Sequence, residues 1–278
     1  MTTSLILRPT GELTETQAAM LAELDREGQA GFDFHPMRLK FPTGGTTSAF
    51  TLSDGDMLKV PLEIIVAVAQ RTRGYWPLAN GKKVLGKPPI CASQDGVSGH
   101  FDAKSEQVQV ALSAYVRHPA LSVVDEAAAA GPWDCIGCPL AQWESASDGS
   151  RAQGCKAMRR LLVIVKGWAM PAVLTLPPTS IKVWDTFASG LRQRGQAYFS
   201  RWLTVEFDKG TGGGNDYAVL KIKPSAPLSD PEAAEVMAIR AQFAELVRHM
   251  DIEADDYVTE DAVDAPVTSA ADEELNPF

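Results

Sequence analysis

The stretch Arg159–Arg194, RRLLVIVKGWAMPAVLTLPPTSIKVWDTFASGLRQR, decides the fold class. Its first part predicts two strands, Arg159–Lys166 and Ala172–Leu176, which pair around a turn that contains Gly and Pro. Two prolines followed by Thr and Ser then open a helix, Ile181–Arg194, whose apolar residues recur at helical spacing. A strand pair followed by a helix is typical of a chain that combines short strands with a few helices.

The rest of the chain repeats this mixture of short strands and a few helices. Further strands are predicted at Met57–Val68, Val108–Val116, Tyr198–Phe207 and Tyr217–Lys223. Further helices are predicted at Leu13–Gly28, which begins with a capping box, and at Pro231–Met250. The expected fold is therefore mainly β with helical insertions (α+β), with a β-barrel or sandwich at its core.

Charge divides the chain into two parts. The formal net charge is -9, but residues 251–278 hold ten acidic residues and no Lys or Arg. Residues 1–250 are left with 25 acidic and 26 basic residues, and within 151–223 there are 12 basic and 4 acidic ones. A near-neutral body with basic segments favours a polyanionic partner, and the acidic, aromatic-poor segment 251–278 is expected to be a disordered tail.

Several function classes lack their sequence signals. The longest apolar run, Ile64–Ala69, is the length of a strand and too short to cross a bilayer. The first ten residues lack the pattern of a secretory signal, so we expect a cytoplasmic protein. No nucleophile elbow, phosphate-binding P-loop or zinc-hydrolase motif is present, which favours a binding protein over an enzyme.

The four cysteines predict a metal site. Cys135 and Cys138 form a C-x-x-C knuckle, and Cys91 and Cys155 lie at turns rich in Gly and Pro. Four thiolates with this spacing can hold one tetrahedral zinc ion, within an insertion that we place at about residues 88–158. A 4Fe-4S cluster also uses four thiolates and remains the alternative cofactor. A zinc ion held in this way would be architectural, because a catalytic zinc normally keeps an open position.

Basic and aromatic residues interleave in two regions, as single-strand binding requires, since cations follow phosphates while aromatic rings stack on bases. The smaller region lies in a loop-like segment and comprises Arg71, Arg73, Tyr75 and Trp76. The larger region supplies Lys156, Arg159, Arg160, Lys166, Trp168, Lys182, Arg192, Arg194, Tyr198, Arg201, Trp202 and Lys221. Some of these aromatics must belong to the core, because side chains on a strand alternate between its two faces.

The end of the chain carries a recognisable signature. Its last seven residues are Asp272-Glu273-Glu274-Leu275-Asn276-Pro277-Phe278. This ending resembles the tip of bacterial single-stranded DNA-binding proteins, an acidic tail that ends in Pro-Phe. The resemblance implies that the tip docks on proteins of replication, recombination and repair. The expected contacts are Phe278 and Pro277 in an apolar pocket, with Asp272, Glu273 and Glu274 near basic residues of the partner.

The body is longer than that bacterial family and carries cysteines, so the whole arrangement looks more like phage-type single-stranded DNA-binding proteins. The segment Cys135 to Thr179 carries this resemblance, with Cys-x-x-Cys-Pro, Gln142-Trp143-Glu144-Ser145, Gly154-Cys155-Lys156, Arg159-Arg160-Leu161 and Leu176-Pro177-Pro178-Thr179-Ser180. The resemblance implies an OB-like β-barrel elaborated by a four-cysteine zinc subdomain over residues 1–250. It also implies action in the bacterial host cytoplasm, close to the nucleoid, and it allows a homodimer.

The leading expectation is thus a non-enzymatic protein that coats and protects single-stranded DNA with little sequence specificity. Two alternatives remain open. One is an iron–sulfur or metal-dependent DNA-processing enzyme, and the other is a zinc-bound adaptor between proteins. The sequence leaves the choice between DNA and RNA open, because basic and aromatic residues serve both.

Overall fold

The computed structural model describes residues 15–16, 19–20, 23, 36–42, 45–76, 78–79, 82–101, 132–146, 151–212 and 215–257. The described strands are β1 (Arg38–Lys40), β2 (Ala49–Leu52), β3 (Met57–Lys59), β4 (Leu62–Tyr75), β5 (Leu78–Ala79), β6 (Lys82–Lys83), β7 (Cys91–Ser93), β8 (Ser98–Phe101), β9 (Trp133–Asp134), β10 (Lys156–Val165), β11 (Ala172–Leu176), β12 (Arg201–Gly212) and β13 (Asn215–Pro227). The helices described over their full length are α3 (Pro178–Gln193) and α4 (Asp230–His249), with 3-10 turns η2 (Pro139–Ala141) and η3 (Ala254–Asp256). None of the described helices combines the length and apolar character that a membrane span requires.

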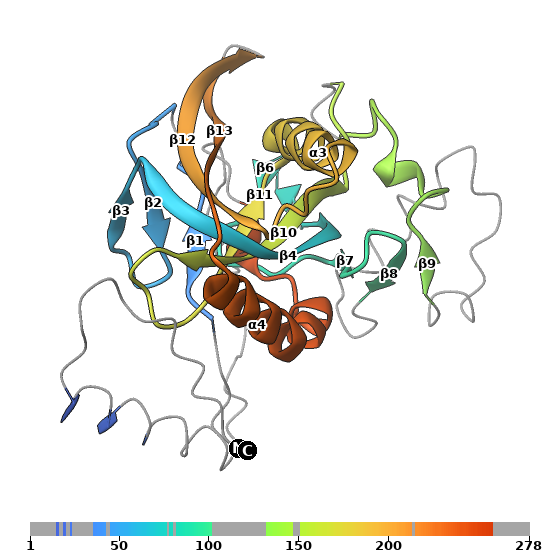
Figure 1. The fold of residues 1–278 in the computed structure, drawn as a ribbon. Coiled ribbons are helices and arrows are strands. Elements are labelled where there is room, and N and C mark those ends of the chain that lie inside the picture. The colour runs from blue at the N-terminus through green and yellow to red at the C-terminus, as the bar shows by residue number, and fades with distance from the viewer. Residues whose placement is uncertain are drawn as a thin grey trace, which may run out of the picture.

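One large curled sheet forms the body of the protein (Figure 1). Its strands follow the order β3-β2-β1-β11-β10-β4, and β1 and β11 are parallel while the other pairs are antiparallel. Beyond β4 the sheet divides, because β12 pairs with the first residues of β4 and β7 pairs with the last ones. The sheet bends into a half-barrel, and the prediction of a mainly β fold with helices is confirmed at this level.

At Ala67, the regular alternation of β4 side chains between the two faces of the sheet shifts by one residue. Val163 of β10 pairs with Val66 and Leu162 pairs with Val68, so Ala67 is an extra residue that has no partner on β10. Such a bulge shifts the alternation of the following residues by one position. The guanidinium of Arg240 in α4 donates a hydrogen bond to the carbonyl oxygen of Ala67, which satisfies this backbone group.

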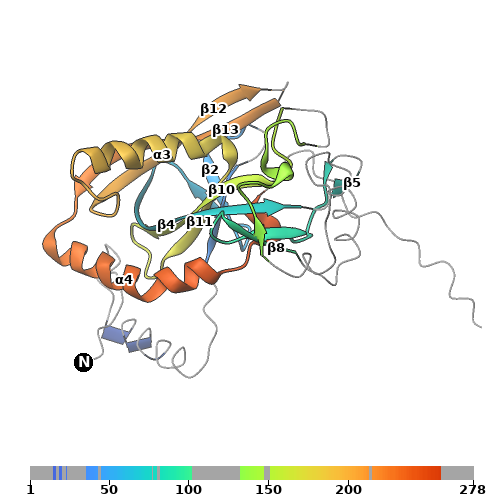
Figure 2. The ribbon, with the colours of Figure 1, turned by 90° about the vertical axis from the view of Figure 1, so that its right-hand side faces the viewer.

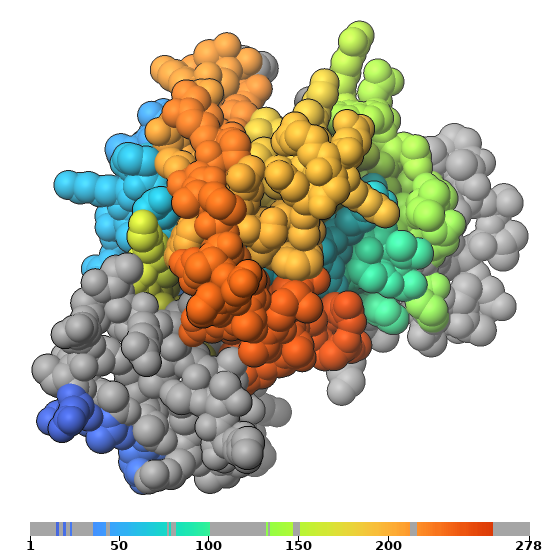
Figure 3. Space-filling model, in the orientation of Figure 1, coloured from blue at the N-terminus to red at the C-terminus, as the bar shows by residue number. Residues whose placement is uncertain are grey.

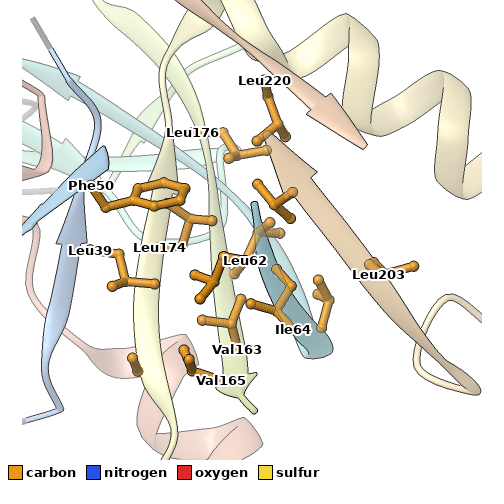
Figure 4. Close-up of a cluster of buried hydrophobic side chains, with 14 of the residues drawn as sticks. Leu39, Phe50, Leu62, Ile64, Val163, Val165, Leu174, Leu176, Leu203 and Leu220 are labelled. Carbon is orange, nitrogen blue, oxygen red and sulfur yellow. The ribbon is translucent and has the colours of Figure 1, made fainter. Parts of the chain in front are cut away.

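The sheet has a separate core on each face. The α3-side core contains Phe50, Val66, Leu161, Leu174 and Trp184 among its buried residues (Figure 4). The α4-side core is built from Ile65, Ala67, Val68, Leu162, Ile164, Val173, Val236, Ile239, Phe243 and Val247. The central strands are buried on both faces, which explains why β10 reads as a continuous run of apolar residues.

The two helices cover opposite faces of the sheet (Figure 2). Helix α3 begins with Pro178 in its first turn, and the Ser180 hydroxyl accepts a hydrogen bond (3.0 Å) from the backbone N–H of Leu220 in β13. Helix α4 begins with the capping box that Ser229 and Glu232 form. The Ser180 contact ties the start of α3 to β13, and the capping box satisfies backbone groups at the start of α4.

Residues 251–257 correct the boundary expected for the acidic tail. Ile252 is buried against Trp76 and Met158, and the buried Asp256 carboxylate lies 2.6 Å from an Arg38 nitrogen and 3.2 Å from an Arg160 nitrogen. The expectation of disorder from residue 251 onward was wrong for these seven residues, because their carboxylates meet specific cations of the body. We call residues 251–257 the latch; the tail beyond it lies outside the described residues.

The predicted elements correspond closely to the observed ones in the second half of the chain. Strands β10, β11, β12 and β13 and helices α3 and α4 overlap the six segments predicted there. The segment around Arg71 is strand β4 and not a loop. Five residues of the predicted N-terminal helix, between 15 and 23, are described and helical. The strand predicted at Val108–Val116 lies outside the described residues.

Candidate functional site

The four cysteines converge on the end of β4. Cys91 of β7 pairs with Tyr75, and Cys155 lies opposite Tyr75 on the other side of β4, because the next residue, Lys156, pairs with Gly74. The knuckle is held nearby by two backbone hydrogen bonds, from Cys135 to Val97 (2.8 Å) and from Cys155 to Leu140 (2.7 Å). Pairing within the sheet therefore gathers cysteines that are up to 64 residues apart in the chain.

The cysteine thiols influence one another electrostatically. Burial raises the pKa of Cys91, Cys135 and Cys155, and in each case a neighbouring cysteine raises it further. The pKa of Cys155 reaches about 12. The metal-free thiols of Cys91, Cys135 and Cys155 are therefore protonated at neutral pH, and a metal ion would have to displace their protons on binding. We call these four residues the cysteine cluster.

The placement of the side chains neither completes nor confirms a metal site. All four cysteines are free thiols. Within the described ranges, no three or more His, Cys, Asp or Glu side chains are arranged to hold a metal ion. The chemistry of the donors fits zinc or an iron–sulfur cluster, so both remain predictions.

Arg73 lies at the cysteine cluster. It is half-buried in β4, and its positive charge lowers the pKa of both Cys135 and Cys155 against the larger effect of their burial. Its Nη1 atom is buried and has no hydrogen-bond partner. The sequence analysis assigned Arg73 and Tyr75 to nucleic acid, whereas the structure places them beside these thiols.

Two residues predicted to bind nucleic acid are parts of the core. Arg160 is 1% exposed, and its guanidinium binds Asp256 and the carbonyl oxygen of Asp251 (2.8 Å). Trp76 is 3% exposed, its ring centroid lies 5.4 Å from that of Tyr257, and the Lys83 ammonium lies 4.9 Å from it. Both predictions were wrong, because the latch covers these side chains.

Three further predicted aromatics are half-buried and pack on the cores. Trp168 and Tyr198 pack against the α3-side core, where Tyr198 contacts Trp184 edge-on at 5.4 Å. Trp202 packs against the α4-side core, and its indole N–H donates to Glu232 (3.1 Å). Their positions in the hydrophobic cores account for these residues without a ligand.

Several predicted cations already have partners. Arg159 binds Asp185 of α3 through two hydrogen bonds (2.7 and 3.0 Å), and Lys166 pairs with Glu63. The ammonium of Lys156 donates to the carbonyl oxygen of Gln153 (2.6 Å). Lys221 lies 3.0 Å from Asp208, and the neighbouring Lys209 and Lys223 are paired with Asp216 and Glu206. The three lysines of the β12–β13 hairpin thus have acidic partners within the hairpin itself.

The remaining predicted cations are concentrated on and after α3. Lys182, Arg192 and Arg194 are exposed and Arg201 is half-buried, and none forms an ion pair with another described residue. Arg71, which is exposed on β4, also lacks such a pair. Asp185 is the single carboxylate of α3, and Arg159 already binds it. The exposed cations on and directly after α3 therefore have no acidic partner among the described residues.

The sequence analysis missed two exposed apolar residues beside the cysteine cluster. Trp143 is 73% exposed and Ile136 is 72% exposed. The Gln142 side chain donates to the carbonyl oxygen of Ile136 (3.1 Å), which holds this part of the knuckle together. Figure 3 shows the knuckle segment, in light green, beside the surface of α3. A large aromatic residue in a loop with few apolar neighbours in sequence was the available signal.

Comparison with protein-family models, with curated proteins and with solved structures found no match to this chain. The predicted partner-binding residues of the tip, 272–274 and 277–278, lie outside the described residues.

Proposed function

We propose that the protein binds single-stranded DNA without catalysing a reaction, coats it with little sequence preference, and recruits replication, recombination or repair proteins through its C-terminal tip. The observation that carries the proposal is a group of exposed cations on and directly after α3, Lys182, Arg192 and Arg194, which have no acidic partner among the described residues. The curled sheet below it is compatible with the OB-like barrel that the sequence resemblance implies.

The spacing of these cations suits an extended polyanion. Lys182 and Arg192 are ten residues apart, which corresponds to about 15 Å along a helix. Cations spread over this distance can contact several successive phosphates of one strand, and the release of counterions would supply most of the free energy of binding. We propose that α3 forms the phosphate-contacting surface and that Arg71 and Arg201 extend it.

The cysteine cluster has an architectural role in this proposal. Cys91, Cys135, Cys138 and Cys155 would hold one zinc ion, or an iron–sulfur cluster in the alternative, and the ion would join the knuckle to β4 and β7. The thiol protons would leave when the metal binds. The knuckle would then hold Trp143 in a fixed position beside α3.

The proposal is tested by fluorescence anisotropy with labelled oligo-dT, a matching duplex and a single-stranded RNA, each at two salt concentrations. The expected result is salt-sensitive binding to oligo-dT, weaker binding to the duplex, and RNA binding that reports the choice between DNA and RNA. An affinity that does not fall with salt would contradict the phosphate-contacting role of α3, because such contacts release counterions.

Removal of the tail should strengthen binding. A chain that ends at Tyr257 loses six acidic residues but keeps the latch. We expect several-fold tighter binding to oligo-dT at low salt, with a smaller difference at high salt, because screening weakens competition between the tail and DNA. Equal affinities for the two chains at low salt would show that the tail does not compete. A chain that ends at Met250 is unsuitable for this comparison, since it also lacks Asp256.

Trp143 separates the leading proposal from the adaptor. If Trp143 stacks on a base, Trp143→Ala should weaken oligo-dT binding by about 1–3 kcal/mol with little change in the salt dependence. The Tm should change little, because the side chain is 73% exposed. Trp143→Phe is the matched variant and should retain much of the affinity. Unchanged DNA binding in Trp143→Ala would favour a role of this exposed surface in binding proteins.

A further inference from the structure

We propose that Arg73 is a positioning residue of the metal centre, whose guanidinium donates N–H···S hydrogen bonds to the metal-bound thiolates and offsets their negative charge. The inference rests on the proposed four-cysteine site and is independent of DNA binding. It reassigns a residue that the sequence pattern had placed in the nucleic-acid interface.

The bulge in β4 determines that Arg73 faces the cysteines. Beyond Ala67, the odd-numbered residues lie on the α3 side, as the packing of Ala69 in the α3-side core shows. Arg73 pairs with Ser93 in β7 and with Ala157 in β10. Cys91 and Cys155 are two residues from these partners, and therefore lie on the same face as Arg73.

Within the described part of the chain, no carboxylate is paired with Arg73. No described Asp or Glu forms an ion pair with it, and its Nη1 atom is buried without a hydrogen-bond partner. A buried N–H group is costly unless an acceptor is close by. The nearby groups are Cys135 and Cys155, whose thiols Arg73 influences electrostatically. They become anions when they bind a metal.

Metal binding and Arg73 would therefore complement each other. Four thiolates around one zinc ion leave a net negative charge, which the guanidinium reduces. The unsatisfied N–H would gain a sulfur acceptor at the same time. Groups that hydrogen-bond to metal ligands in this way orient them and adjust the affinity and reactivity of the site.

The test compares zinc retention in the full chain and in Arg73→Met. Each protein is loaded with zinc and challenged with a chelator, while zinc release and thiol alkylation are followed. We expect about 10–100-fold weaker zinc retention in Arg73→Met, the usual effect of removing such a partner. Arg73→Lys keeps the charge but not the planar donor fork, and should retain zinc to an intermediate degree.

Arg71→Met is the matched control. Arg71 is exposed on the same strand, two residues earlier, so the variant removes one cation without altering the cluster. Zinc retention in Arg73→Met equal to that of the full chain and of Arg71→Met would overturn the proposal. If both Arg73 variants fail to fold, the full chain loaded with ¹¹³Cd decides, since coupling between cadmium and the Arg73 N–H protons supports the hydrogen bonds and its absence overturns them.

Two further outcomes concern the metal itself. A full chain that binds neither zinc nor an iron–sulfur cluster would overturn both the metal site and the role of Arg73, while DNA binding would be measured separately. Visible absorbance would identify an iron–sulfur cluster. Arg73→Met should then lower the reduction potential of that cluster, because a positive charge and hydrogen bonds to sulfur favour the reduced state, and an unchanged potential would count against the proposal.

Discussion

Asp256→Ala should lower the free energy of unfolding by about 3–5 kcal/mol, the usual cost of removing one partner of a buried ion pair. The Asp256 side chain is 3% exposed and lies between Arg38 and Arg160, while its carboxylate also accepts a hydrogen bond from the Thr175 hydroxyl (2.8 Å). Its loss would leave the buried Arg160 without a carboxylate partner. Denaturation by urea, followed by circular dichroism, measures this change.

Asp255→Ala is the control for this variant. Asp255 is the adjacent residue and pairs with Lys40 at 2.6 Å, but its side chain is half exposed, so its removal should cost about 1 kcal/mol or less. Equal effects of the two substitutions would show that the latch contributes through its overall charge and not through the buried contact.

The pH dependence gives a second measurement of the same contact. Burial raises the pKa of Asp256, but Arg160, Arg38 and the N–H of Glu253 lower it more, and the net pKa is below the usual range. The ionised carboxylate therefore stabilises the fold above its unfolded-state pKa of about 3.9. This stabilisation is lost as the pH falls through the lower folded-state pKa, so the difference between the full chain and Asp256→Ala should narrow in acid.

The combined substitution Lys182→Gln, Arg192→Gln and Arg194→Gln should weaken oligo-dT binding by about 100-fold near 0.1 M salt. If each cation contacts one phosphate, the slope of log affinity against log salt should also fall by about 2, at roughly 0.7 per contact with a single strand. The three side chains are exposed, so the Tm should change little. Anisotropy titrations over a series of salt concentrations measure both quantities.

The matched control replaces Lys209, Lys221 and Lys223 of the β12–β13 hairpin by Gln. This variant makes the same change in net charge, but these lysines are already paired with Asp216, Asp208 and Glu206. We expect a much smaller loss of affinity. If both variants bind equally weakly, DNA responds to the net charge of the body, and the assignment of the contact surface to α3 is wrong.

The sequence predicted the second half of the fold because its local signals agreed there. Prolines at the start of α3 and a capping box at α4 coincide with changes of hydrophobic period. The full length of β4 was missed because Gln70–Arg73 is polar, and those residues are recruited as strand by pairing with β10. Likewise, the acidic composition of the latch concealed its order, which depends on Arg38 and Arg160 far away in the chain.

The candidate site depends even more strongly on contacts between distant residues, which local sequence patterns do not reveal. The excess of basic residues in 151–223 was counted correctly, but its four carboxylates all pair with cations of that segment. A charge count cannot show which cations are already paired with carboxylates of the protein.

The cysteines were predicted to act together from their spacing, and the sheet brings them together. The proximity of Arg73 to them depended on a one-residue irregularity that leaves no local pattern.

Because of that irregularity, the two parts of β4 follow opposite patterns of side-chain facing. Up to Val66, the even-numbered positions face α3; beyond Ala67, the odd-numbered positions do. Without the extra residue, the Arg73 side chain would point to the face that Trp76 now occupies. The Trp76 side chain would point to the face that carries the thiols. Ala67 thus separates the apolar first part of β4 from the second part, which carries Arg73 and lies beside the cysteine cluster. The two halves can accept substitutions independently, provided that the length of chain between them is kept.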